Sequence, residues 1–255
     1  MLALISDIHS NLDALEATFR DIDTQGVDDV VCLGDVIGYG ACPREVVQLI
    51  RERCGLCLLG NHDAALLDDQ SAFGFNDRAL AAIDFTRVAL DPESECNWEI
   101  WDWLGELHAA ETLRYDGGEE MFLVHASPCE PLSEYLLPGA DSNSPKLQAN
   151  FEAAGCRLTF YGHTHHPGWF EQGQSFVRAD DTCDQLEPGA DSRYLINVGS
   201  VGQPRDGDNR SCYALFDGNT VRWRRVEYNI ESARARIHQA EGLPNSLGDR
   251  LLVGR

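Results

Sequence analysis

The sequence predicts an α/β protein that forms one domain of two β-sheets flanked by helices. Two observations lead to this fold class. Within the first 60 residues, short apolar runs alternate with amphipathic helical patterns, and this βαβαβ order is typical of parallel strands joined by helical crossovers. In the second half of the chain, short runs of β-branched and aromatic residues follow one another between turns rich in Gly, Asn and Asp. Because no repeat, low-complexity tract or linker divides the chain, we expect a single domain over residues 1–255.

The first part of the chain contains three predicted strands, with a helix after each of the first two. The strands are short apolar runs at Leu2–Ser6, Val30–Leu33 and Leu56–Leu59. The first helix is predicted by apolar residues spaced three or four apart, at Leu12, Leu15, Phe19 and Ile22. Pro43 is typical of the first turn of a helix and predicts where the second one begins. In parallel sheets, ligands bind beyond the carboxyl ends of the strands, so we expect the chemistry there.

Residues 64–111 are predicted to form a helical insertion. The pattern indicates helices at Ala79–Leu90 and Cys96–Leu107, which Asp91-Pro92 separates. This insertion either fills out the hydrophobic core or forms a cap that shapes access to a site. The sequence leaves both interpretations open.

The rest of the chain is rich in predicted strands. Six of them are indicated, at Met121–Val124, Leu158–Tyr161, Trp169–Phe170, Tyr194–Val198, Cys212–Phe216 and Val221–Val226. Helices are predicted near Pro145–Ala154 and at Ile230–Ala240. The acidic segment Asp180–Asp191 has no periodicity and is predicted as a loop.

The charge balance excludes several kinds of partner. Lys and Arg total 20 against 42 Asp and Glu, which gives a formal net charge of −22. Such a field repels nucleic-acid backbones and anionic membrane surfaces, so we expect no nucleic-acid and no membrane partner. No segment is long and apolar enough to cross a bilayer, and no secretory leader is recognisable at the start, so we expect a cytoplasmic protein. An anionic substrate could bind only where local positive charge outweighs the negative electrostatic field of the protein.

The nine cysteines are odd in number and scattered, which argues against a disulfide framework. Cys54 and Cys57 form a C-x-x-C, but no second pair completes a zinc ribbon. We interpret Cys57 as a buried core thiol rather than as half of a redox pair.

Metal-type ligands follow five of the predicted strands directly. They occur in the segments Asp7-x-His9, Gly34-Asp35, Gly60-Asn61-His62-Asp63, His125 and Gly162-His163-Thr164-His165. In extended backbone, residues i and i+2 project to the same side, so Asp7 with His9, and His163 with His165, can each direct two ligands into one cavity. The glycines permit tight turns without a Cβ atom that crowds the site. Five histidines in this context argue against ordinary core or surface histidines.

The ligand chemistry indicates transition metals. Imidazoles and oxygens without a thiolate suit Mn, Fe, Co, Ni or Zn better than Ca²⁺, which prefers oxygen-only sites. The ligands are too numerous for one tetrahedral ion and fit two adjacent ions: Asp7, His9, Asp35, Asn61, His125, His163 and His165. Two divalent cations outweigh the two carboxylates and reverse the local field, as a phosphate ester requires.

These motifs resemble the complete and ordered motif set of the calcineurin-like metallophosphoesterases. The segment Asn197–Asp206 is similar to the N-P-G-S-x-G-x-P-R stretch of the bacterial "predicted phosphodiesterase" branch, and the tail Leu243–Leu251 also resembles that branch. The resemblance implies a sandwich of two mixed sheets flanked by helices.

The resemblance also implies roles for individual residues. Asp7, His9 and His165 would hold one metal, Asn61, His125 and His163 would hold the other, and Asp35 would bridge them. A metal-bridging water or hydroxide, with manganese the favoured metal, would attack phosphorus. His62 would protonate the leaving oxygen, and Asp63 would orient His62.

Two departures from the family pattern concern phosphate binding. Val36 follows Asp35, so the Asp-Arg pair of protein-phosphatase-type members is missing, and Val198 replaces a usual proline. Arg205 is the nearest candidate for a phosphate-binding cation, with a structural ion pair as the alternative. Asn11 is either a donor to a phosphate oxygen or a helix N-cap.

We therefore expect a two-metal phosphoesterase that acts on a small phosphate mono- or diester. A phosphoprotein (Ser/Thr) phosphatase is an alternative that the missing Asp-Arg pair makes less favourable. A non-catalytic scaffold similar to the retromer subunit is a second alternative, which the retention of His62 opposes. Residues 64–111 and the loop 126–144 are expected to select the substrate. The sequence predicts no oligomeric state.

Overall fold

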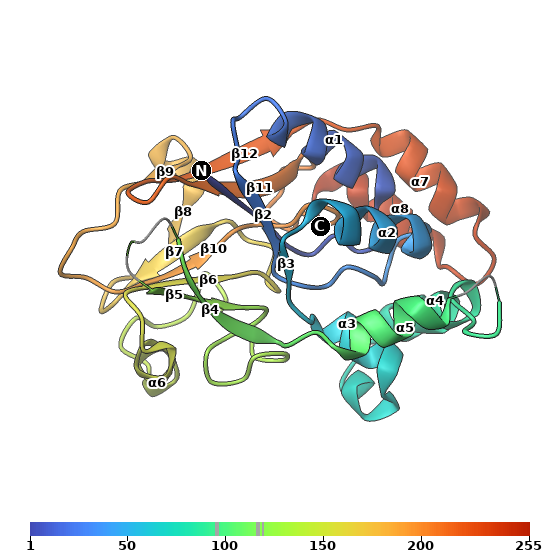
Figure 1. Cartoon of the computed structure of the whole chain (residues 1–255), viewed down its shortest axis with the longest axis horizontal. Helices are drawn as coiled ribbons and strands as arrows, with labels where there is room; N and C mark the ends of the chain where they lie inside the picture. Colours follow the sequence, from blue (N-terminus) through green and yellow to red (C-terminus); the bar gives the residue numbers. More distant parts are fainter. Residues whose placement is uncertain (95–96, 116–117, 119) are drawn as a thin grey trace.

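The chain forms two six-stranded mixed sheets that pack face to face (Figure 1). The computed structural model describes residues 1–94, 97–115, 118 and 120–255. In the first sheet the strands lie in the order β3 (Leu56–Cys57), β2 (Asp29–Cys32), β1 (Leu2–Ile5), β11 (Ser211–Phe216), β12 (Val221–Val226) and β9 (Gln185–Leu186). In the second sheet the order is β4 (Ala110–Arg114), β5 (Glu120–Val124), β6 (Leu158–Tyr161), β10 (Tyr194–Asn197), β7 (Gly168–Glu171) and β8 (Val177–Arg178).

Both sheets combine three adjacent parallel strands with antiparallel neighbours. In the first sheet β1, β2 and β3 are parallel, and β11 pairs antiparallel with β1. In the second sheet β5, β6 and β10 are parallel, and β4 and β7 are antiparallel additions. The parallel strands of both sheets therefore provide the carboxyl ends where ligands are expected.

Successive side chains of β1 point alternately into two hydrophobic cores, one on each side of the first sheet. Leu2 and Leu4 belong to the core between the sheets, together with Leu123 and Phe160 of the second sheet. Ile5 belongs instead to the core between the first sheet and the helices, because neighbouring residues of a strand face opposite sides. Burying each such side chain contributes about 1.5–3 kcal/mol.

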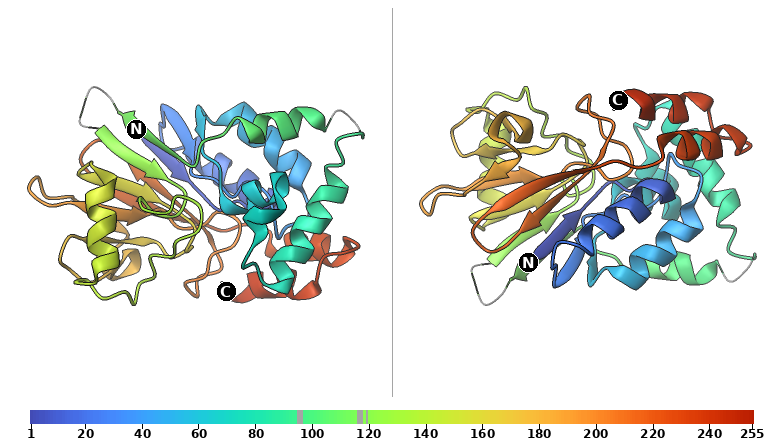
Figure 2. Two further views of the ribbon diagram at one scale, coloured as in Figure 1. Left: turned by 90° about the horizontal axis from the view of Figure 1, so that it is seen from below. Right: turned by 90° about the horizontal axis from the view of Figure 1, so that it is seen from above.

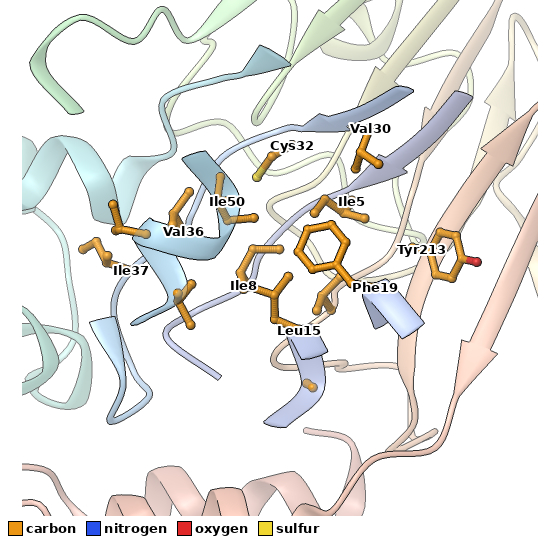
Figure 3. Packing of buried hydrophobic residues seen from close by; sticks show 14 of the residues in the cluster. Ile5, Ile8, Leu15, Phe19, Val30, Cys32, Val36, Ile37, Ile50 and Tyr213 are labelled. Atoms are coloured by element: carbon orange, nitrogen blue, oxygen red, sulfur yellow. The ribbon is translucent and has the colours of Figure 1, made fainter. Parts of the chain in front are cut away.

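Helices cover both outer faces (Figure 2). Leu15 and Phe19 of α1 (Leu12–Ile22) and Ile50 of α2 (Pro43–Arg53) pack with Ile5 and Val30 of the first sheet (Figure 3). On the other side, α6 (Pro145–Ala154) covers the second sheet. The remaining helical elements are α3 (Asn61–Leu67), η1 (Asp69–Ala72), α4 (Asp77–Ala89), α5 (Trp98–Gly105), η2 (Ala179–Thr182), α7 (Ile230–Gln239), α8 (Asn245–Asp249) and η3 (Arg250–Val253).

The predicted fold class is confirmed, and so are most of the predicted elements. The strands β4, β8 and β9 were not expected, because they are short or polar edge strands without a continuous apolar run. The predicted loop Asp180–Asp191 contains most of η2 and all of β9. The helix expected at Cys96–Leu107 is found as α5, Trp98–Gly105, and Cys96 itself lies outside the described residues. Two short helices, α3 and α8, were also missed.

The helical insertion is part of the packed core. Ile83 and Leu90 on or beside α4, and Ile100 and Leu104 on α5, belong to the cluster that includes Ile5. The core-filling interpretation therefore holds for these two helices. The connection between α3 and α4 lies elsewhere, beside the cavity described below.

The eight cysteines in the described part of the chain are all free. Cys57 lies beside Cys32 on the neighbouring parallel strand. A hydrogen bond with Cys32, together with burial, raises the pKa of the Cys57 thiol well above its ordinary value, and burial does the same for Cys54. Cys57 is only partly buried, so the prediction of a buried core thiol is not met in full. Its thiol nevertheless stays protonated at neutral pH, as expected for an inert cysteine. Within the described ranges, no helix has both the length and the apolar character needed to cross a membrane.

Candidate metal centre

The carboxyl ends of strands from both sheets meet at one site. Asp7 and His9 follow β1, Asp35 follows β2, and Asn61 begins α3 after β3. From the second sheet, His125 follows β5, and His163 and His165 follow β6. The structure thus brings together all seven residues that the sequence predicts as metal ligands. All of them except Asn61 are at most 3% exposed.

Two groups of potential ligand atoms meet at Asp35. In one group, the His165 Nε2 lies 3.2 Å from Asp7 Oδ1 and 3.3 Å from His9 Nε2. In the other, the His125 Nε2 lies 3.1 Å from Asn61 Oδ1. Asp35 Oδ2 lies 3.6 Å from His9 Nε2 and 3.5 Å from His125 Nε2, which places this carboxylate between the groups.

The same residues form three overlapping sets of clustered donors. Each set has ligand atoms within 4.8 Å of one another: Asp7, His9 and His165; His9, Asp35 and His62; and Asp35, His125 and His163. Asp35 is shared by the second and third sets, and His9 by the first and second. This geometry is suited to two cations that share a carboxylate.

Hydrogen bonds to the backbone orient three of the imidazoles. The Nδ1 atoms of His9, His125 and His165 lie 3.2, 2.9 and 2.5 Å from the carbonyl oxygens of Ile37, Leu33 and Gln203, respectively. Because a carbonyl only accepts, each Nδ1 must carry the proton, and each Nε2 is left with a free lone pair. Outer hydrogen bonds of this kind are typical of metal-binding histidines.

The backbone at the site is strained. Non-glycine residues rarely adopt positive φ, yet the residues with φ between 49° and 60° include Asp7, His9, Asp35, His163 and His165. A left-handed residue of this kind costs about 1–2 kcal/mol. Such outliers gather at functional sites, where the surrounding structure holds them.

Two glycines allow the loops that carry the ligands to approach one another closely. A Cβ atom at Gly60 would collide with Asp35, and one at Gly162 would collide with Ser6 and Asp7. Only glycine fits at these contacts, because no other residue lacks a Cβ atom.

Burial shifts the ionisation of the site. It raises the pKa of Asp7 to about 6, and burial together with the neighbouring Asp63 and Asp7 raises the pKa of Asp35 well above its usual range. Burial also lowers the pKa of every clustered imidazole, and Arg205 adds to this effect at His62 and His165. Buried carboxylates that resist ionisation beside neutral imidazoles form a site that a bound cation would stabilise.

The donors fit the divalent transition metal that this arrangement implies. Imidazole nitrogens and carboxylate oxygens are the ligand types such ions accept. The Nε2 atom of His163 is buried and has no hydrogen-bond partner in the described part of the chain, which is costly unless something else binds it.

His62 lies against the site on α3, where it is 4% exposed. Its ring centre lies 5.0 Å from that of His9 and 4.4 Å from that of Tyr39. Its Nδ1 has no hydrogen-bond partner among the described residues.

The structure gives Asp63 a different role from the expected one of orienting His62. Its carboxylate accepts hydrogen bonds from the backbone N–H groups of Val36, Ile37 and Gly60, at 3.2, 3.1 and 2.9 Å. It therefore fixes the loop after β2 and caps the start of α3, instead of orienting His62. The backbone N–H groups bind the Asp63 carboxylate in place of the His62 ring. The spacing of His62 and Asp63 in the sequence does not reveal these hydrogen bonds.

Asn11 was expected either to donate to a phosphate oxygen or to cap a helix, and the structure shows the second role. Its Oδ1 accepts from the N–H of Ala14 at 3.2 Å, and its Nδ2 donates to the carbonyl of Gly202 at 2.8 Å. The amide is used by the protein itself, so the N-cap alternative is the one that the structure shows.

Arg205 lies at the site and has no carboxylate within ion-pair distance in the described part of the chain. Its Nε and Nη2 donate to Gln203 Oε1 at 3.2 and 2.7 Å, and its Cζ lies 5.8 Å from the ring centre of Tyr39. The ion-pair alternative therefore does not hold. Its positive charge acts to lower the pKa values of Asp7, Asp35 and His163.

The sequence did not indicate several residues around the cluster. Tyr135 lies with its ring centre 4.0 Å from that of His163, and Phe75 lies 4.7 Å from His62. Arg250, from the C-terminal η3, lies with its Cζ 5.9 Å from the Tyr39 ring centre. Burial and the nearby Arg205 lower the pKa of Arg250 to about 10. Tyr135 and Phe75 stand in no motif, and Arg250 lies in the tail Leu243–Leu251, whose resemblance to the family branch gave it no role.

Comparison with known proteins agrees with this geometry. The sequence model of the "Calcineurin-like phosphoesterase superfamily domain" matches residues 1–220. An uncharacterized protein of Methanocaldococcus jannaschii is 38% identical over 263 residues, which cover 100% of this chain and 98% of the relative. The solved metallophosphoesterase from Sphaerobacter thermophilus is 35% identical with a TM-score of 0.81, over 100% of this chain and 98% of that one.

A hypothetical protein from Pyrococcus horikoshii OT3 shares the fold with a TM-score of 0.78 at 20% identity, over 100% of this chain and 99% of that one. The family match covers both sheets' parallel strands and every clustered ligand, and the similar chains align over their whole length. The chain belongs to the calcineurin-like phosphoesterase superfamily.

Proposed function

We propose that this protein hydrolyses a small phosphate mono- or diester with the help of two divalent cations. The observation that carries the proposal is the position of Asp35, whose Oδ2 lies within 3.6 Å of one imidazole from each ligand group. Family membership supports phosphate-ester chemistry and metal dependence. The retention of His62 and of all seven ligands favours an enzyme over a non-catalytic scaffold.

The donor atoms divide into two sets. Asp7, His9 and His165 would hold one cation, Asn61, His125 and His163 would hold the other, and Asp35 would contact both. Two bound cations would supply positive charge for the phosphoryl oxygens and a water of lowered pKa as nucleophile. The imidazole and oxygen donors are compatible with manganese, our first choice, and also with Fe, Zn, Co or Ni.

His62 is the proposed proton donor. Its ring clusters with His9 and Asp35, but it lies outside the two ligand sets proposed above. Burial and Arg205 lower its pKa, so the ring is neutral without substrate. An anionic phosphate beside the ring would favour the protonated form. The imidazolium then donates its proton to the leaving alkoxide oxygen as the ester bond breaks.

Arg205 is the proposed phosphate-binding residue. Its guanidinium is held by Gln203 rather than by a carboxylate, so its charge is available to an anionic ligand. In a protein of net charge −22, such a cation contributes to the local reversal that a phosphate ester requires.

The experiment is a metal-supplemented assay with p-nitrophenyl phosphate and bis-p-nitrophenyl phosphate. We expect nitrophenolate release with Mn²⁺ but not with EDTA, and no release from Asp35→Asn. Asp102→Asn, an exposed residue on α5, is the matched control and should retain full activity. Wild-type protein that binds Mn²⁺ but hydrolyses neither these esters nor a panel of phosphorylated metabolites and peptides would favour the scaffold alternative. Hydrolysis of phosphopeptides alone would favour the phosphoprotein phosphatase.

A further inference from the structure

A cavity of about 480 Å³ opens directly beside the candidate metal centre. His163 and Asn61, two of the proposed ligands, form its inner end. Its walls come from the segment 70–75, between α3 and α4, and from residues 132–135 of the loop after β5. A phosphate held at the centre would therefore have the rest of its ester beside this cavity.

Three aromatic side chains, those of Phe73, Phe75 and Tyr135, line the walls together with Leu132. Phe73 and Phe75 contribute from one side, and Tyr135 and Leu132 contribute from the other. The ring of Tyr135 lies against His163, with ring centres 4.0 Å apart at an angle of 37°. Aromatic faces of this kind bind planar groups by stacking.

No charged side chain lines the cavity among the described residues. The polar groups in the walls are the amides of Asn61 and Gln70, the hydroxyls of Ser71, Ser133 and Tyr135, and the imidazole of His163. In a chain with 42 acidic residues, this stretch of neutral surface stands out. A polyphosphate chain would find no cation here, and a basic peptide would find no carboxylate. Amides and hydroxyls instead suit the polar edge of an uncharged ring.

The exposure of Phe73 also indicates that the cavity binds an apolar or ring-shaped group. Its side chain is 95% exposed, whereas most large apolar side chains of this protein are buried. A phenylalanine contributes nothing to folding in that position, because it removes no apolar area from water. Its place at the edge of a cavity beside buried ligands gives it a role in contacting something that enters from solvent.

The size of the cavity agrees with a ring-bearing ester. A volume near 480 Å³ lies in the range of pockets that enclose an organic ligand of moderate size, about 300–1,000 Å³. A phosphate with a short alkyl group would leave most of this space filled only by water.

We propose that this cavity, defined by Phe73, Phe75, Leu132 and Tyr135, binds an uncharged planar ring carried by the phosphate ester. The substrate class is thus an ester in which such a ring, for example a heterocyclic base on a sugar, lies within a few bonds of the scissile phosphate. This inference rests on the proposed phosphoesterase function for its chemistry. The recognition of the ring rests only on the cavity.

The first arm of the test measures ring binding without metal or hydrolysis. Saturation-transfer NMR in EDTA compares adenosine with ribose, which differ only in the planar base. We expect binding of adenosine and not of ribose. Phe73→Ala should weaken the binding roughly tenfold, as expected for the loss of one stacking partner. Because Phe73 is almost fully exposed, this variant should fold normally. Trp98→Ala removes a 52% exposed aromatic side chain far along the chain from the cavity walls and is the matched control.

The second arm measures hydrolysis in Mn²⁺. Adenosine 5′-monophosphate and ribose 5-phosphate share the same scissile bond, so any preference reports the base. We expect a kcat/KM ratio of at least tenfold in favour of the nucleotide, and we expect Phe73→Ala to reduce this ratio while Trp98→Ala does not. If the protein acts only on diesters, the two compounds are compared as competitive inhibitors of bis-p-nitrophenyl phosphate hydrolysis.

The outcomes separate the two proposals. Equal use of the two phosphates, or equal effects of Phe73→Ala and Trp98→Ala, would overturn the ring-binding inference while leaving phosphoesterase function intact. Adenosine binding that depends on Phe73 without hydrolysis of any ester would support ring binding and contradict the proposed function. If Phe73→Ala instead abolishes self-association in gel filtration and leaves adenosine binding unchanged, the surface contacts a second copy of the chain and the inference is wrong.

Discussion

Replacing Asp7 with asparagine should stabilise the metal-free protein at neutral pH and weaken its stabilisation by Mn²⁺. Asp7 is fully buried, and burial raises its pKa from 3.8 to about 6. A raised pKa means that this carboxyl stabilises the fold below its unfolded pKa, and that this stability is lost as pH rises from about 4 through about 6. At 1.36 kcal/mol per pKa unit, the loss for the metal-free protein amounts to about 3 kcal/mol at pH 7.

Asparagine avoids this cost because it does not ionise. Its oxygen can still accept the backbone N–H of His163, which lies 3.0 Å from Asp7 Oδ2. Its amide nitrogen can donate to the Nε2 lone pair of His165, which faces Asp7 Oδ1 at 3.2 Å. For a chain of this size, a gain of about 3 kcal/mol corresponds to a rise of about 6–12 °C in Tm.

The assay is thermal unfolding followed by circular dichroism in EDTA between pH 4 and pH 7. We expect the Tm difference between Asp7→Asn and wild type to be small at pH 4 and to grow up to pH 7. Because Asp7 also raises the pKa of Asp35 and of His125, the difference reports Asp7 together with its effect on these two neighbours. Asp102→Asn should show no such trend. Excess Mn²⁺ should then stabilise the wild type by about 2.7 kcal/mol for each site at 100 times its Kd. Asp7→Asn should gain less, because only the set of Asn61, His125 and His163 with Asp35 is intact. A variant less stable than wild type at pH 7 in EDTA, or equally stabilised by Mn²⁺, would refute the reasoning.

Three further substitutions test individual roles. His62→Gln should lower kcat by roughly 100- to 10,000-fold while the bound Mn²⁺ measured by elemental analysis stays unchanged, and loss of the metal would show that His62 is a ligand instead. Arg205→Gln should raise the KM for the ester roughly tenfold or more, because a charge-assisted hydrogen bond to phosphate is lost, and an unchanged KM would exclude that contact. Asn11→Ala should lower the free energy of unfolding in urea by about 0.5–2 kcal/mol through loss of the N-cap while kcat stays close to wild type. A large fall in kcat without loss of stability would return Asn11 to the phosphate site.

Apolar periodicity was sufficient to predict the buried elements. The run Leu2–Ile5 is a fully buried strand, and the stripe that includes Leu15 and Phe19 is the buried face of α1. The edge strand Ala110–Arg114 could not be predicted in the same way, since its side chains are largely exposed and carry no apolar signal. The start of α3 was hidden within a motif read as a turn; Gly60 followed three residues later by Asp63 is the capping signal that could have revealed it.

The metal ligands were predictable because each stands directly after a strand, and parallel strands end at a common edge. Asp63 was misjudged because its three hydrogen bonds go to N–H groups of two different loops, which only the folded chain brings together. The cavity beside His163 was equally hidden. It joins residues 70–75 to residues 132–135, segments that the sequence marked as substrate-selecting without indicating that they face each other.

Anomalous diffraction from crystals grown with Mn²⁺ tests the central claim most directly. The geometry predicts two manganese peaks, about 3.5–4 Å apart, one among Asp7, His9 and His165 and the other among Asn61, His125 and His163. The Asp35 carboxylate should lie between the two peaks and contact both. A single peak, or peaks that leave Asp35 without a metal contact, would contradict the two-cation centre.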